Sequence, residues 1–505
     1  MFKSVLLFIV VVCLSGYLFF RKSRKRLYEL AATFPGPFDL PLIGSAYVAF
    51  GRGPDEIYNY LFELVPKYTT PLRAWAGPLL FLVFTQPEHL SVILNSQDCV
   101  RRTYLYEFFN LGQGIFIAKP DVWRKLRKQL NPSFTIGAVK KFVPLLNRKS
   151  DDFVKRLDVF DGQKAFDVLH VAAEFTLTST VATTLDYDLD KAGSIDIKRF
   201  LENAERMFSL MFTRVYKAWL HPQIIFKFTS NYREQVHRSE KFITVARKII
   251  ESRQERKRNN PTFALSAERD DDNIRNSEIL IEKLERIASE SNLLNDETML
   301  DNINTFILAS YDTTASTIAA TLLMLAMHPD VQERAFQEIN DTILSDDIDY
   351  EHLSKLVYLE MVLKETMRLV PVTPAIGRVC EKETKVGEHM VPKGAQIIIP
   401  IHILHRDKNV WGERADYFDP ENFSPEKSDK RHPYAFLGFS GGIRNCIGMR
   451  YAYMVLKIAV AKMIMNYKFS TDIKYADIKF NASVVMRIAN GYMISLERRK
   501  KETDN

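Results

Sequence analysis

The chain has 505 residues, of which 46% are hydrophobic and 26% are charged, and its formal net charge is +7. This mild charge, with no block of basic residues interleaved with aromatic ones, argues against a nucleic-acid-binding protein. The cysteines lie far apart and form no CxxC pair, which argues against a disulfide framework or a zinc site and indicates a protein that faces the reducing cytosol. They are Cys13, Cys99, Cys380 and Cys446.

An apolar run opens the chain. No charged residue occurs from Ser4 to Phe20, and the basic stretch RKSRKR follows at once. The run has the length of a short membrane span, and basic residues directly after a span hold that flank in the cytosol. A cleaved signal peptide would instead carry its basic residues before the apolar run. We therefore predict an N-terminal transmembrane helix, with residues 1–26 as an uncleaved anchor in the endoplasmic reticulum membrane.

The stretch FPGPFDLPLIG comes next and is rich in proline and glycine, which disfavour a helix. We predict a stiff proline-rich hinge over residues 27–44, compatible with an ordinary linker, and one large domain over residues 45–505. In that domain the apolar pattern predicts a strand at 79–84, a helix at 86–94 and a strand at 394–400. Long helices are predicted at 195–212, 232–258, 293–327 and 356–369. The charged segment Arg253–Asn276 is predicted to be a solvated loop, and the fold class is mainly α.

The stretch FLGFSGGIRNCIGMR, residues 436–450, surrounds a lone cysteine with glycines. Glycine lets the backbone turn tightly enough to aim N–H groups at one sulfur, and the helix predicted after Cys446 adds a favourable partial charge there. Such a cysteine suits an axial thiolate to haem iron, with Arg444 close enough to reach a haem propionate. A buried structural cysteine in a glycine-rich turn is the alternative.

The spacing of Phe439, Gly442, Arg444, Cys446 and Gly448 resembles the FxxGxRxCxG signature of the cytochrome P-450 superfamily, the haem-thiolate monooxygenases. The resemblance implies heme b, with iron bound axially by the thiolate of Cys446. It also implies that Phe439 packs near the sulfur and moderates its electron donation. Gly448 would let the helix approach the porphyrin closely.

The segment LASYDTTAS resembles the family's (A/G)GxDTT segment, in which an acid–alcohol pair passes protons during oxygen activation. Asp312 and Thr313 match that pair and are the predicted catalytic residues. Two positions depart from the pattern. Ser310 replaces a glycine, so the helix is expected to be less distorted. The chain also resembles the insect branch of the fatty-acid ω-hydroxylase clan, many of whose members carry a glutamate where Ala309 stands, so we expect non-covalent haem.

Three further matches complete the resemblance. KETMRL supplies Glu365 and Arg368 of the ExxR motif, a structural pair; Asn422 stands where the family closes a triad with arginine, and either Asn422 or backbone carbonyls would complete the network. Trp123 and Arg127 match WxxxR and share a helix face, where indole N–H and guanidinium suit haem propionates. Arg378 matches another propionate arginine.

The resemblance covers nearly the whole chain. It implies a cytochrome P-450 fold, mainly α with a small β-rich lobe, in which residues 45–505 form the monooxygenase domain. NADPH–cytochrome P-450 reductase would supply electrons, with or without cytochrome b5, to oxidise a small lipophilic substrate such as a xenobiotic, a fatty acid or a hormone. The alternatives are a haem-thiolate isomerase or dehydratase that needs no oxygen activation, and a non-catalytic membrane scaffold.

Apolar positions that match the family's substrate-facing segments are as consistent with ordinary core as with a binding site. The aromatic and basic segment Met211–Phe228 joins two predicted helices, and it suits contact with the membrane surface as well as a packed loop. The substrate-facing candidates are Phe108, Phe109, Met207–Phe212, Phe306, Ala309, Thr373–Ile376 and Val484–Val485.

Overall fold

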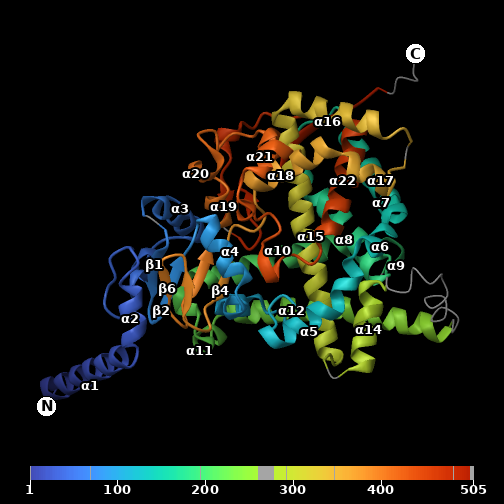
Figure 1. Ribbon diagram of the computed structural model, residues 1–505. Coiled ribbons are helices and arrows are strands. Elements are labelled where there is room, and N and C mark those ends of the chain that lie inside the picture. The colour runs from blue at the N-terminus through green and yellow to red at the C-terminus, as the bar shows by residue number, and fades with distance from the viewer. Residues whose placement is uncertain are drawn as a thin grey trace. The chain divides into compact units, whose positions relative to one another are not determined.

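The structure is a computed structural model that describes residues 2–68, 70–193, 195–259, 278–291, 293–345, 347–481 and 483–500. Its elements are labelled in Figure 1. The chain divides into two compact units. The smaller unit consists of Met1–Thr103, Ala375–Pro400 and Gly442–Arg444, and the larger unit consists of Tyr104–Pro374, Ile401–Gly441 and Asn445–Asn505.

The smaller unit is built on a four-stranded sheet with the strand order β1-β2-β7-β4. Strands β2 and β7 run parallel, although they lie far apart in the sequence, and the other pairs are antiparallel. The sheet strands are β1 (Leu72–Ala76), β2 (Leu79–Val83), β4 (Ile376–Val379) and β7 (Gln396–Ile399), and β5 (Thr384–Val386) and β6 (His389–Val391) form a separate hairpin. The helices are α1 (Phe2–Ser23), α2 (Lys25–Ala31), α3 (Pro54–Leu64) and α4 (Pro87–Asn95).

The N-terminal segment is helical, as α1 and α2. Among the residues described here, no helix is long and apolar enough to cross a membrane, so the predicted transmembrane helix is not confirmed. Helix α2 occupies the beginning of the predicted hinge, and the proline-containing stretch after it has no helix before η1 (Ser45–Ala49).

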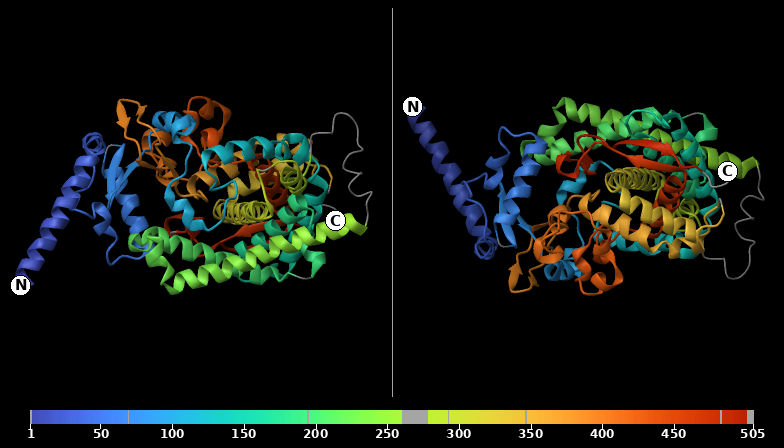
Figure 2. Two further views of the ribbon diagram at one scale, coloured as in Figure 1. Left: turned by 90° about the horizontal axis from the view of Figure 1, so that it is seen from below. Right: turned by 90° about the horizontal axis from the view of Figure 1, so that it is seen from above.

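The larger unit is helical and is organised around α15 (Asp296–Met327), whose residues are buried over most of its length. Helices α8 (Val168–Leu185), α18 (Val357–Leu369) and α22 (Met449–Asn466) pack against it. Figure 2 shows α15 end-on with helices on several sides of it. From Thr313 to its end, α15 has no charged residue and is mostly apolar, which explains this position, because such a helix is stable only when neighbours cover most of its surface.

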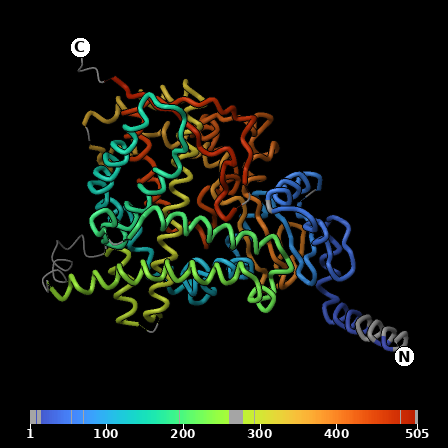
Figure 3. The backbone as a smooth tube through the Cα atoms, turned by 180° about the vertical axis from the view of Figure 1, so that it is seen from behind, coloured from blue at the N-terminus to red at the C-terminus, as the bar shows by residue number. Residues whose placement is uncertain are grey.

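The remaining helices of the larger unit surround this core. In Figure 3, α12 runs across α15, against which it packs. These helices are α5 (Pro120–Leu130), α6 (Ile136–Lys140), α7 (Val143–Leu157), α9 (Leu189–Ala192), α10 (Ile197–Tyr216), α11 (Gln223–Lys227), α12 (Ser230–Asn259), α14 (Leu280–Glu290), α16 (Pro329–Thr342), α17 (Tyr350–Lys355), α19 (Ile401–Leu404), α20 (Lys408–Trp411) and α21 (Pro425–Asp429).

Short strands complete the larger unit. One sheet has the order β3-β11-β8, and a two-stranded sheet pairs β9 with β10. The strands are β3 (Phe166–Asp167), β8 (Tyr467–Ser470), β9 (Phe480–Asn481), β10 (Arg487–Ile488) and β11 (Met493–Arg498). The prediction of a mainly α fold with a small β-rich part is confirmed, and the long predicted helices correspond to α10, α12, α15 and α18.

The first part of the charged segment Arg253–Asn276 is helical and not a solvated loop as predicted. Helix α12 continues to Asn259, and the side chain of Arg253 is buried there. Its guanidinium is paired with Asp186, Glu282 and Glu285 from other helices, which compensates for the loss of water around the charge. These partners are distant in the sequence, so charge density alone gave the wrong prediction. Residues 260–277 of the predicted loop lie outside the described residues.

Candidate active site

Cys446 lies just before α22, which begins at Met449. Its backbone N–H donates to the carbonyl of Phe439 at 3.0 Å, which closes the loop back on itself. The ring of Phe439 packs on Tyr453 of α22, with centroids 4.8 Å apart. The loop is therefore tied to the first turns of α22.

Gly442 shows why this loop needs glycine. Its φ is +66°, a left-handed conformation, and an added Cβ would lie 2.0 Å from the carbonyl oxygen of Leu94. No other residue can meet both conditions without moving backbone atoms. By contrast, a Cβ on Gly448 would be 4.0 Å from the Cys446 sulfur, an ordinary contact.

The Cys446 side chain is exposed, although protein surrounds it closely enough that burial raises the pKa of its thiol. The backbone N–H of Gly448 and the charge of Arg127 act in the opposite direction and favour the thiolate. Cys446 is thus exposed, while the protein atoms around it reduce the hydration of its thiol. That environment suits a thiolate reserved for a metal ion.

One face of α15 is not packed against protein. Ala309 is exposed, and Ser310 and Thr313 are half-buried, in the middle of a helix that is otherwise almost entirely buried. The hydroxyl of Thr313 donates to the carbonyl of Ala309 at 2.8 Å. Helix α15 also packs against α22, the helix that follows Cys446. The structure thus gives α15 an accessible face at the residues that the sequence pattern selected.

Asp312 points elsewhere. Its side chain is 2% exposed and is paired through Oδ1 with the guanidinium of Arg487 on β10. A second nitrogen of Arg487 donates to Ser316, one turn further along α15, at 3.0 Å. Burial raises the pKa of Asp312, and the positive charge of Arg487 opposes that rise. Sequence analysis missed Arg487, because nothing near it in the chain marks it as a partner of α15.

Trp123 and Arg127 lie on α5, as the WxxxR spacing requires. Trp123 is buried, and Arg127 donates to the backbone carbonyl of Asn445 at 2.9 Å and to the side-chain oxygen of Asn445 at 2.8 Å. Burial lowers the pKa of Arg127, and the neighbouring Cys446 thiol acts in the opposite direction. The guanidinium therefore lies beside the residue that precedes the candidate thiolate.

Arg378 and Arg444 belong to the smaller unit, where both are buried. Arg378 lies on β4 and donates to the carbonyl of Gly377 at 2.9 Å. Arg444 ends the short 3-10 helix η10 (Gly442–Arg444), which packs against α4. A buried guanidinium requires polar or anionic neighbours.

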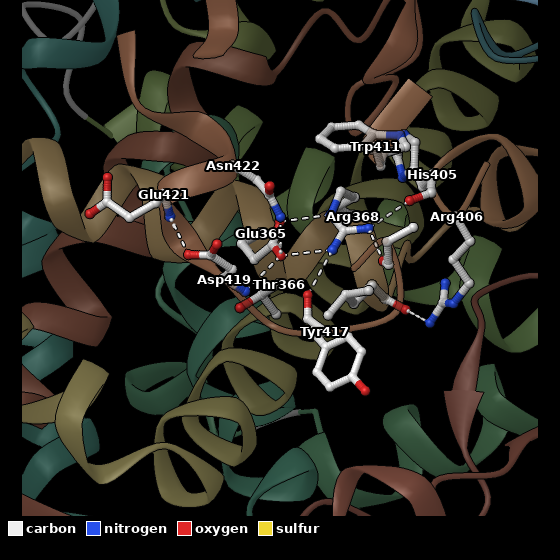
Figure 4. A network of polar contacts seen from close by, with 12 residues as sticks. Glu365, Thr366, Arg368, His405, Arg406, Trp411, Tyr417, Asp419, Glu421 and Asn422 are labelled. Atoms are coloured by element: carbon white, nitrogen blue, oxygen red, sulfur yellow. Dashed lines mark hydrogen bonds and ion pairs between the residues drawn. The ribbon is translucent and has the colours of Figure 1, made fainter. Parts of the chain in front are cut away.

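The ExxR pair forms a fully buried network, shown in Figure 4. Glu365 and Arg368 make two hydrogen bonds of 2.7 Å each. Asn422 donates to Glu365 at 3.1 Å, and the backbone N–H of Asp419 donates to the same carboxylate at 2.9 Å. Arg368 also donates to the carbonyl of His405 at 2.8 Å. Both alternatives for completing the triad, the Asn422 side chain and backbone groups, are thus present.

His405 and Arg431 extend this network, and the sequence analysis identified neither. The backbone N–H of Leu437 donates to Nε2 of His405 at 2.9 Å, which joins the ExxR pair to the glycine-rich loop. Burial and the charges of Arg368 and Arg406 lower the pKa of His405 to about 3. Arg431 donates to the carbonyl of Asn422 at 2.7 Å and stacks on Trp411 at 4.0 Å. The guanidinium of Arg431 is therefore close to Asn422, the position at which the family pattern has the third residue of the triad, an arginine.

These residues fit a haem group. The donor set offers one soft sulfur ligand, exposed but desolvated, for iron. Helix α15 supplies an accessible face at Ala309, Ser310 and Thr313. No group of three or more histidine, cysteine and carboxylate side chains that could hold a metal ion occurs in the described ranges.

Comparison with known proteins agrees with this geometry. Residues 34–496 match the family described as Cytochrome P450. Similar proteins include probable cytochrome P450 313a4 of Drosophila melanogaster, 30% identical over 96% of this chain and 97% of the relative. Cytochrome P450 4g1 of Drosophila melanogaster is 28% identical over 98% of this chain and 94% of the relative. Cytochrome P450 4c21 of Blattella germanica is 26% identical over 97% of this chain and 98% of the relative.

Members of this family bind haem through a cysteine thiolate, take electrons from a redox partner and act on lipophilic substrates. The match extends over nearly all of the large predicted domain. The glycine-rich loop, the accessible face of α15 and this match lead to one conclusion: the chain belongs to the cytochrome P450 family and is a haem-thiolate monooxygenase.

Proposed function

We propose that Cys446 is the cysteine that ligates the haem iron. The observation that carries this proposal is an exposed sulfur held by the Phe439 loop closure, with the Gly448 N–H and the Arg127 charge favouring the thiolate. Cys99 and Cys380, the other cysteines whose side chains are described, are buried. The bound haem supplies oxygen activation at its iron.

Reduced protein exposed to CO should therefore show the red-shifted Soret band that thiolate ligation gives. Cys446→Ser should abolish this band, while Cys99→Ser and Cys380→Ser, the matched controls, should keep it. A normal band in the Cys446 variant would disprove the assignment, and loss of the band in all three variants would indicate a folding defect instead.

Thr313 and Asp312 are the proposed proton-delivery pair. Thr313 presents its hydroxyl on the accessible face of α15, where it can hold a water molecule, and Asp312 lies on the buried side of the same helix. A proton reaching Asp312 from the protein can pass by water to the Thr313 hydroxyl. In this proposal, buried Asp312 and accessible Thr313 together link the protein interior to the face of α15 where the reaction takes place.

Trp123, Arg127, Arg378 and Arg444 are the proposed contacts of the haem propionates. Their indole and guanidinium groups are donors suited to carboxylates. For Arg127 the proposal is supported by its hydrogen bonds to Asn445 in the loop of Cys446, and Trp123 lies one turn earlier on the same helix. For Arg378 and Arg444 it rests on the sequence pattern, with their burial in the smaller unit in agreement.

The proposed substrates are lipids and lipophilic foreign compounds. Ala309, small and exposed on α15, leaves room for an apolar molecule, and Phe306 one turn earlier stacks on Phe134 at 5.7 Å. Phe108 is buried, and its ring lies under the guanidinium of Arg214 and beside His221. Because Ala309 cannot form an ester with haem, we propose non-covalent haem.

The proposed electron donor is NADPH–cytochrome P-450 reductase, with or without cytochrome b5. Its docking surface would be the basic face of α5, formed by Arg124, Lys125 and Lys128, all of which are exposed. Trp123 on the same helix is buried in the protein, so the basic side of α5 faces outward. A basic surface steers an acidic partner to the correct side of the protein.

The proposed location is the endoplasmic reticulum membrane. The uncharged run Ser4–Phe20 with its basic flank supports an anchor, as residues 1–26. A second contact is proposed at η7 (Ala218–Leu220) and α11, within the predicted membrane-facing segment. Large apolar side chains are exposed there, and Lys217 and Lys227 flank them. The apolar residues are Trp219, Ile224, Ile225 and Phe228.

A further inference from the structure

Arg487 is held against α15 by two residues of one helical turn. Its guanidinium pairs with Oδ1 of Asp312 and donates to Ser316 Oγ at 3.0 Å. Ser316 in turn donates to the backbone carbonyl of Asp312 at 2.8 Å. The Asp312 carboxylate and the Ser316 hydroxyl thus hold the guanidinium of Arg487 in place. Rotation of the Asp312 carboxylate would break its ion pair with Arg487.

The other oxygen of Asp312 has a different environment. Oδ2 is buried and has no hydrogen-bond partner in the described part of the protein. The hydroxyl of Tyr492, which follows β10, is buried in the same way. Buried polar atoms are normally satisfied by ordered water when protein groups do not reach them. One carboxylate oxygen is thus fixed by protein and the other is available to water.

The charges around Asp312 come from several elements. Arg487 and Tyr492 face it from the β10 side, Tyr311 precedes it on α15, and Glu205 acts on it from α10. Burial is the main cause that raises the pKa values of Asp312 and Tyr311, and the negative charge of Glu205 adds to it. Glu205 is exposed. The ring of Phe200 on the same helix packs edge-on against Tyr311, with ring centroids 6.3 Å apart. A solvent-facing carboxylate therefore lies on the outer side of this buried cluster.

We propose that Arg487 is a positioning residue for proton delivery: it holds one oxygen of the Asp312 carboxylate so that the other is presented to water on the path to Thr313. This inference rests on the proposed role of Asp312. The ion pair with Arg487 explains how a charged carboxylate can remain buried on α15, because an unpaired buried charge would be strongly destabilising. The proposal also assigns a function to a residue outside the family motifs found in the sequence.

The first test measures coupling in the full-length holoenzyme, as product and peroxide formed per NADPH consumed. Arg487→Met should lower the product fraction about tenfold, and Arg487→Lys should restore part of it because the charge remains. Arg253→Met, which also removes a buried and paired guanidinium, is the matched control and should keep coupling. Equal loss in Arg253→Met and Arg487→Met would overturn the proposal, since it would indicate a general effect of destabilisation.

Asp312→Asn separates this inference from the function on which it rests. If Asp312→Asn leaves coupling intact, the proposed proton role of Asp312 fails. If Asp312→Asn uncouples the enzyme while Arg487→Met does not, only the positioning role of Arg487 fails. Uncoupling by both substitutions, with no further loss in the double variant, is the expected result.

A second measurement does not depend on turnover. Without Arg487, the folded protein should bind a proton at Asp312 up to higher pH than the unfolded chain does, so stability should fall as pH rises above the ordinary aspartate range. The loss of thermal midpoint caused by Arg487→Met should therefore grow with pH, and Asp312→Asn in the same background should remove this growth. A loss that is the same at every pH would overturn the coupling of the two residues.

Discussion

At the scale of single residues, Thr313 and Asp312 show how adjacent positions on one helix have different surroundings. A helix turns by about 100° per residue, so neighbouring side chains face different surroundings. Thr313 lies on the accessible face, whereas Asp312 is 2% exposed and paired with Arg487. The threonine hydroxyl already donates to the Ala309 carbonyl, which leaves its lone pairs free to accept from water.

Thr313→Ala should keep haem and substrate binding but divert reducing equivalents from product to peroxide. We expect product formation to fall roughly 100-fold, the lower range for loss of a proton-transfer group, with NADPH consumption much less affected. Measuring NADPH, peroxide and product in one assay checks this. Thr317→Ala, one turn further along and buried, is the matched control, and unchanged coupling in Thr313→Ala would remove Thr313 from the mechanism.

His405 makes stability depend on pH. Its folded-state pKa is about 3, below the ordinary value of 6.5, because it is buried beside Arg368 and Arg406. The unfolded chain therefore takes up a proton that the folded chain does not, and stability is lost as pH falls below 6.5. His405 should account for a loss of about 2 kcal/mol between pH 7 and pH 5.

His405→Gln keeps an acceptor for the Leu437 N–H and removes this proton. Urea unfolding at pH 7 and pH 5 should show a smaller acid-induced loss of stability in the variant than in the natural protein. An identical loss in both would mean that His405 is protonated in the folded state or accessible to water.

At the scale of elements, α5 combines two surfaces. Trp123, Leu126 and Leu130 are buried, while Arg124, Lys125 and Lys128 are exposed. Arg124 is paired with exposed Asp121 at 2.9 Å, an interaction that contributes little to stability. The charges of the exposed face are therefore available to a partner with little cost to the fold.

Replacing Arg124 and Lys128 together by Glu should slow reductase-driven turnover, most at low ionic strength, because salt screens steering. Turnover driven by added peroxide should be spared, since that route bypasses the reductase. Lys468 and Lys479, exposed basic residues away from α5, serve as a control pair for general charge effects when replaced by Glu. Equal loss by both routes would show that the haem site was damaged and would contradict the docking surface.

At the scale of the whole molecule, η7 and α11 expose several large apolar side chains, which we assigned above to a proposed membrane contact. Phe228 is 86% and Ile224 72% exposed, close to Lys217 and Lys227. Arg214 fixes this segment to α10, since its guanidinium donates to the carbonyls of Leu220 and His221. These hydrogen bonds hold the backbone between η7 and α11 in place, next to the exposed apolar side chains.

Removing residues 1–26 should weaken binding to vesicles that contain anionic lipid but leave the haem spectrum intact. In that background, replacing Trp219, Ile224 and Phe228 by Ser should release the protein further, as measured by co-sedimentation. Val159 and Leu344, exposed apolar residues elsewhere, provide the matched control when replaced by Ser. Complete release on truncation alone would contradict the second membrane contact.

The sequence by itself determined the class of fold, the family and the candidate thiolate. Those features depend on local spacing: the loop around Cys446 needs glycine where φ is positive, and ExxR and WxxxR place two side chains on one helix face. The tertiary structure alone decided which distant groups compensate for buried charge. Arg487 lies 175 positions from Asp312, and His405 joins Arg368 to Leu437 across similarly unrelated segments. The reason is physical: a buried charge must find a partner in space, and folding selects that partner from the whole chain.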